Sequence, residues 1–107
     1  MRIEAGHALG AEEVRRRLDD LIKGLAGRQW PAGVEVHDIE TRWVDENLDF
    51  KFLASRGYFD AAVSGRLTVS GTSLVLDVEI PRVVLMFLGE DRIREGLEGE
   101  LRRLLQA

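Results

Sequence analysis

Hydrophobic and polar positions alternate with a period of two over four stretches in the middle of the chain. In one of them, Leu48, Phe50 and Phe52 alternate with polar or charged residues. The other three stretches cover residues 35–44, 59–69 and 74–80. Short turns rich in Asp, Asn, Ser and Gly separate them, so the pattern predicts four consecutive antiparallel strands with one buried face.

Helical periodicity flanks these strands on both sides. Before them, apolar residues spaced by four, three and four predict an amphipathic helix over residues 11–26. These residues are Val14, Leu18, Leu21 and Leu25. After them, a second apolar stripe predicts a helix that Pro81 can begin. Its members are Ile93, Leu97, Leu101, Leu104 and Leu105.

The two ends of this pattern complete the predicted fold. Residues 1–5 suit a short strand or arm, and Trp30-Pro31 with Gly33 marks a loop. The predicted order is β-α-β-β-β-β-α. Each helix has one apolar stripe and the sheet has one apolar face. We therefore predict an α+β domain over residues 1–107, with an antiparallel meander sheet and both helices packed on one face.

Composition and charge exclude several classes of function. The net charge of −4 argues against nucleic-acid binding, and Arg15, Arg16 and Arg17 would point about 100° apart on a helix. The absence of cysteine excludes disulfides and thiolate metal sites. The longest apolar run, residues 83–88, is far shorter than the ~20 residues of a membrane span. We expect a cytoplasmic protein.

No group of residues has the spacing of a catalytic or metal site. His7 and His37 are the only histidines, and neither has a ligand partner at metal-binding spacing. The pairs Asp45-Glu46 and Glu90-Asp91 are not embedded in apolar sequence, which would be needed to raise a carboxyl pKa. The sequence therefore predicts no enzyme, no cofactor and no metal.

His37 nevertheless has two interpretations. Alternation along its strand places it on the inward face with Thr41 and Trp43. His37 is then either a polar side chain in an apolar pocket or a strand-end histidine whose ring reaches water. The first interpretation describes a small lipophilic-ligand-binding domain with a cavity between sheet and helices. The predicted lining of that cavity is His37, Thr41, Trp43, Phe50 and Phe52.

The apolar run at residues 83–88 departs most from a plain domain. If it begins the second helix, Val83, Met86 and Phe87 fall near the apolar stripe. Val84, Leu85 and Leu88 fall outside it and would form an exposed apolar surface. That surface would contact a second copy in a homodimer or a hydrophobic surface, or form the mouth of a lipophilic pocket. Alternatively, the run is threaded through the core, or is covered by the loop around Trp30 or by the N-terminal strand.

Several segments resemble one known family in order along the chain. They are the opening His7 to Arg17, the aromatic positions Trp43 and Phe50, the strand Gly65 to Val69, and Leu88-Gly89 leading into the last helix. They are similar to the polyhydroxyalkanoic acid system family, small bacterial proteins associated with the polyhydroxyalkanoate granule region. The resemblance implies a cytoplasmic protein linked to storage granules, and it carries no catalytic residues. We therefore expect a non-enzymatic module that contacts a hydrophobic surface or another protein.

Overall fold

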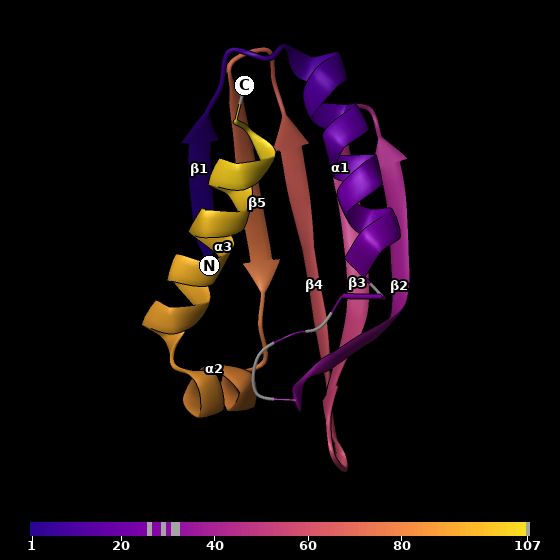
Figure 1. Ribbon diagram of the computed structural model, residues 1–107, viewed down its shortest axis with the longest axis vertical. Helices are drawn as coiled ribbons and strands as arrows, with labels where there is room; N and C mark the ends of the chain where they lie inside the picture. Colours follow the sequence, from indigo (N-terminus) through magenta and orange to yellow (C-terminus); the bar gives the residue numbers. More distant parts are fainter. Residues whose placement is uncertain (26, 29, 31–32, 107) are drawn as a thin grey trace.

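A five-stranded antiparallel sheet forms one layer of the molecule, and helices cover one of its faces (Figure 1). The computed structural model describes residues 1–25, 27–28, 30 and 33–106. The strands are β1 (Arg2–Gly6), β2 (Glu35–Val44), β3 (Asn47–Arg56), β4 (Phe59–Val69) and β5 (Ser73–Glu79). Their spatial order is β1-β5-β4-β3-β2, and each neighbouring pair is antiparallel. The predicted α+β class and the four-strand meander are confirmed, and β1 joins the sheet at the free edge of β5.

In the described part of the chain, three helices accompany the sheet: α1 (Ala11–Leu25), α2 (Arg82–Leu88) and α3 (Glu90–Leu104). In Figure 1, α1 and α3 lie in front of the sheet, whereas α2 lies across its lower end. The sequence predicts one final helix, whereas the structure divides it into α2 and α3. Gly89, with a backbone φ of 83°, separates the two. Residues that have a side chain rarely adopt that backbone conformation. Two predicted positions, Ala26 at the end of the first helix and Pro31 in the following loop, lie outside the described residues.

The core lies between the sheet and the two long helices. Val14 and Leu18 of α1 are fully buried, and Leu101 of α3 is nearly so. The sheet contributes the inward residues that alternation predicts, which include Leu48, Val63, Val69, Leu74, Leu76 and Val78. Each such side chain contributes about 1.5–3 kcal/mol of hydrophobic free energy. The helix-free face carries charge, for example the Arg66–Asp49 ion pair at 2.6 Å.

A bulge in β2 changes which residues face the helices. The register with β3 shifts between His37 and Glu40, and Asp38 there has a positive φ of 53°. His37 pairs with Leu53, whereas Trp43 pairs with the buried Leu48. Leu48 and Leu53 differ by an odd number of residues, so they point to opposite faces. The inward placement of His37 is therefore wrong, because one inserted residue shifts the alternation.

The β3–β4 hairpin projects beyond the helices at the end of the molecule where α2 lies (Figure 1). Its turn runs through Gly57 and Tyr58, and Gly57 has a φ of 61°. The side chain of Tyr58 is fully exposed. The hairpin tip and α2, although far apart in sequence, together form one end of the molecule.

Candidate apolar binding site

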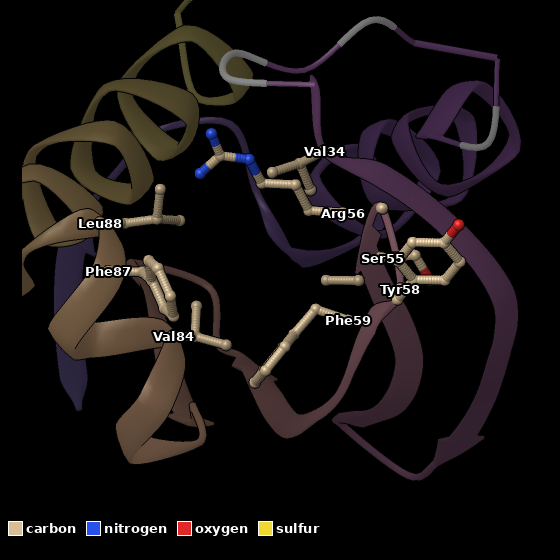
Figure 2. A pocket seen from close by; sticks show the side chains of 10 residues that line it. Val34, Ser55, Arg56, Tyr58, Phe59, Val84, Phe87 and Leu88 are labelled. Carbon is tan, nitrogen blue, oxygen red and sulfur yellow. The ribbon is translucent and has the colours of Figure 1, made fainter.

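A hollow of about 610 Å3 lies between the β3–β4 hairpin and α2 (Figure 2). The hairpin supplies Ala54, Tyr58 and Phe59 to its walls, and α2 supplies Val84, Phe87 and Leu88. Val34, immediately before β2, lines another side. Pockets that bind small ligands usually have volumes of about 300–1,000 Å3 and mostly apolar walls. The hollow meets both conditions.

Apolar side chains are also exposed around this hollow. Tyr58 is fully exposed, and the exposed fractions of Met86, Phe87 and Phe59 are 78%, 69% and 50%. The rings of Phe59 and Phe87 meet edge to face, with their centroids 6.0 Å apart. This contact joins the hairpin to α2. We call Tyr58, Phe59, Met86 and Phe87 the apolar end; monomers seldom leave so many large apolar groups together in water.

The predicted orientation of residues 83–88 is wrong for two of its side chains. Met86 and Phe87 were expected to point inward, yet they are its two most exposed side chains. The expectation assumed one continuous helix, and the turn at Gly89 breaks the helical phase. No residue of α2 is fully buried, so the run is not threaded through the core.

The three residues predicted to contact a partner are half-buried. Val84 and Leu88 line the hollow, whereas Leu85 is not among its lining residues. Arg28, two residues before Trp30, forms an ion pair with Glu100 of α3 at 2.5 Å. Met86 and Phe87 are exposed, so none of the described residues covers them. A partner contact at Val84, Leu85 and Leu88 stays a prediction.

The five residues predicted to line a pocket under the helices do not line this hollow. Phe50 and Phe52 stack on each other, with centroids 6.2 Å apart, and pack against the core. Trp43 donates from Nε1 to Asp19 at 3.0 Å, and the Arg15 guanidinium lies 4.4 Å from its ring centroid. Thr41 is exposed. His37 lies on the opposite face of the sheet, so these residues do not form one concave site.

His37 belongs to a polar chain on the helix-free face. Its Nε2 lies 2.5 Å from Ser55 Oγ, and its Nδ1 lies 3.2 Å from a carboxylate oxygen of Asp38. The Ser55 hydroxyl donates to the Asp60 carboxylate. A hydroxyl has one proton, so Ser55 cannot also donate to His37 in this arrangement. The chain joins β2, β3 and β4 on the helix-free face.

The carboxyl groups whose pKa values are shifted lie away from the hollow. Hydrogen bonds from Arg16 and Arg17 lower the pKa of Glu13 on α1 to about 2. The Arg66 guanidinium lowers the pKa of Asp49 on the helix-free face. Both carboxylates are stabilised in their charged form, which suits an ion pair and not a general acid.

Within residues 1–25, 27–28, 30 and 33–106, the side chains of His, Asp and Glu form no group of three that could hold a metal ion. Across the same described residues, no helix combines the length and the apolar character needed to cross a membrane. Of the described residues that line the hollow, Arg56 alone carries a charge.

The fold and the hollow define a class of protein: a two-layer α+β domain with an apolar hollow at one end of its sheet. Residues 1–105 match the model of the family described as "Putative polyhydroxyalkanoic acid system protein (PHA_gran_rgn)". The chain belongs to this family, and the predicted resemblance is confirmed. No curated protein and no solved structure matches the chain.

Proposed function

We propose that this protein is a non-enzymatic interaction module that docks on the polyester surface of polyhydroxyalkanoate granules through its apolar end. The observation that carries the proposal is that the exposed Tyr58, Phe59 and Phe87 line one hollow, with the exposed Met86 on the same short helix as Phe87. The family description, which names the polyhydroxyalkanoic acid system, is the reason for proposing the polyester as the partner. A location in the bacterial cytoplasm, where such granules would be met, belongs to the same proposal.

The shape of the molecule suits this role. The molecule is elongated, with principal extents of 41, 25 and 21 Å. In Figure 1, with the longest axis vertical, α2 and the hairpin tip lie at the bottom, and the long helices lie above them. Docking by this end would cover the exposed rings and leave the charged helix surfaces in water. Each Å2 of apolar area that the polyester covers would contribute about 25 cal/mol.

Charge makes an electrostatic attachment less suitable. The chain has a net charge of −4, so anionic surfaces would repel it at low salt. Apolar contacts do not weaken when salt screens charges. We therefore expect binding to polyester particles to be retained from low salt to about 1 M NaCl, where a Debye length of ~3 Å suppresses exposed charge pairs.

The test is co-sedimentation with polyhydroxybutyrate particles that carry no other protein. The variant Tyr58→Ser/Met86→Ser/Phe87→Ser should lose most of its binding, because each change removes an apolar side chain that is at least 69% exposed. It should still fold, since exposed positions contribute little to stability. The matched control is Val44→Ser at the end of β2, which removes an apolar side chain 40% exposed and should bind normally.

Two results would contradict the proposal. One is equal particle binding by the triple variant and the unchanged protein, with circular dichroism showing both folded. The other is a dimer in light scattering that the triple variant abolishes, combined with no particle binding by the unchanged protein. In that case a second copy, and not the polyester, would be the partner of the apolar end.

A further inference from the structure

The charge in the hollow points to a more specific ligand than an apolar surface. Arg56 follows Ser55 at the end of β3, and Figure 2 shows its side chain extending from the hairpin across the hollow toward Leu88. None of the described residues that line the hollow is acidic. Arg56 also forms no ion pair with any residue in the described part of the chain. The side chain of Arg56 is exposed, as is that of Arg66, which by contrast is paired with Asp49 at 2.6 Å.

An apolar hollow with one unopposed cation is complementary to an amphipathic monoanion. Phe59, Val84 and Phe87 offer contacts for an aliphatic chain. The planar guanidinium of Arg56 can donate two parallel hydrogen bonds to a carboxylate. Arg56 alone balances the single charge of a carboxylate, whereas a phosphate carries about −1.5 to −2 at pH 7. The geometry therefore favours a single carboxylate at the end of an acyl chain.

We propose that the hollow binds the carboxylate end of an aliphatic acyl chain, with the carboxylate on Arg56 and the chain against Phe59, Val84 and Phe87. The inference rests on the proposed function, since it names the chemistry recognised at the same end of the molecule. Two sources carry this group: a free carboxylic acid, or the carboxyl terminus of a polyester chain at a granule surface. Recognition of a chain terminus would add specificity to a contact that is otherwise only hydrophobic.

The first arm of the test uses sodium decanoate and methyl decanoate, with binding followed by amide chemical shifts in NMR. The two probes share the chain and differ in charge. We expect the unchanged protein to bind decanoate about tenfold more tightly than the ester, because Arg56 pairs only with the carboxylate. Arg56→Gln should remove this preference and leave weak binding of both probes. Arg82→Gln, at an exposed arginine of α2 outside the hollow, should retain it.

The second arm distinguishes the two sources. Polyhydroxybutyrate particles would be compared before and after methylation of their chain-terminal carboxyl groups. If the polyester terminus is the ligand, methylation should weaken binding of the unchanged protein and have no effect on Arg56→Gln. If methylation changes nothing while decanoate binding still depends on Arg56, the ligand is the free acid.

The inference fails if decanoate does not shift the amides of residues 54–59 and 84–88, or if decanoate and its ester bind equally well. That failure is distinct from failure of the proposed function. Arg56→Gln keeps Tyr58, Phe59, Met86 and Phe87, so it should still sediment with particles if the apolar end docks on them. Loss of sedimentation in the triple serine variant tests docking without involving Arg56.

Discussion

One glycine in the middle of the sheet decides how closely β4 packs against its neighbours. Gly65 pairs with Phe50 on one side and with Val78 on the other. A Cβ at this position would lie 2.4 Å from the carbonyl oxygen of Asp77 and 2.7 Å from Cζ of Phe50. Those distances are shorter than van der Waals contact, so the space beside Gly65 is already filled by backbone and by an aromatic ring.

We expect Gly65→Ala to lower the free energy of unfolding by about 1–3 kcal/mol, the usual effect of overpacking a well-filled site. Urea denaturation followed by circular dichroism measures the change. The control is Gly96→Ala in α3, where an added Cβ meets nothing within 4 Å. That change should raise stability by about 0.5–1 kcal/mol, because alanine favours a helix interior more than glycine does. An unchanged midpoint for Gly65→Ala would show that β4 and β5 can separate easily.

Among the elements, α2 depends most on its surroundings. It has seven residues, none of them fully buried, and a helix this short is not stable alone. Two features set its position. Gly89 ends it, with the Gly89 amide donating to the Leu85 carbonyl at 2.9 Å, and Phe87 contacts Phe59 of the hairpin. The direction in which α2 presents its side chains therefore depends on the backbone of Gly89.

Gly89→Ala should lower the free energy of unfolding by about 1–3 kcal/mol, since φ of 83° with ψ of 128° is strained for any residue with a Cβ. Because relief of the strain requires α2 to move, the variant should also bind polyester particles less well. Urea denaturation and co-sedimentation measure the two effects. Gly24→Ala in α1, where the added Cβ meets nothing within 4 Å, should change neither in this direction. Normal stability for Gly89→Ala would mean that α2 and α3 can form one helix.

At the scale of the whole molecule, paired carboxylates link stability to pH. The pKa of Glu13 is lowered from 4.5 to about 2 by Arg16 and Arg17, and the pKa of Asp49 is lowered by Arg66. A carboxyl whose pKa is lower in the folded state stabilises that state when the pH is above its unfolded value. This stabilisation is lost as the pH falls through the folded value. The molecule should therefore lose stability as the pH falls below about 4.5.

For Glu13→Gln, we expect a lower urea midpoint than that of the unchanged protein at pH 7. The difference between the two midpoints should shrink as the pH falls from 4.5 and should be nearly gone at pH 2, where the Glu13 carboxyl is half protonated in the folded state. Glu12→Gln is the matched control, because Glu12 is on the same helix turn and forms no ion pair with the described residues. A difference that stays constant between pH 7 and pH 2 would show that Glu13 acts through its shape and not its charge.

Local periodicity in the sequence determined most of the architecture. Alternation in residues 48–52, 59–69 and 74–80 predicted strands in an antiparallel meander, and the stripes at residues 14–25 and 93–105 predicted the helices that cover it. Each signal lies within one element, where the side-chain direction follows from the residue number alone. The family resemblance also came from the sequence, because it depends on the order of residues along the chain.

The tertiary structure decided the relations across breaks in those elements. The bulge after His37 moved that side chain to the helix-free face, and the turn at Gly89 exposed Met86 and Phe87. The hydrophobic periodicity does not predict the direction of side chains beyond either break, because the backbone dihedral angles there are set by packing with other segments. The hollow likewise combines residues 34, 54–59, 84, 87 and 88. Only the folded sheet brings these segments together, since no local spacing in the sequence relates them.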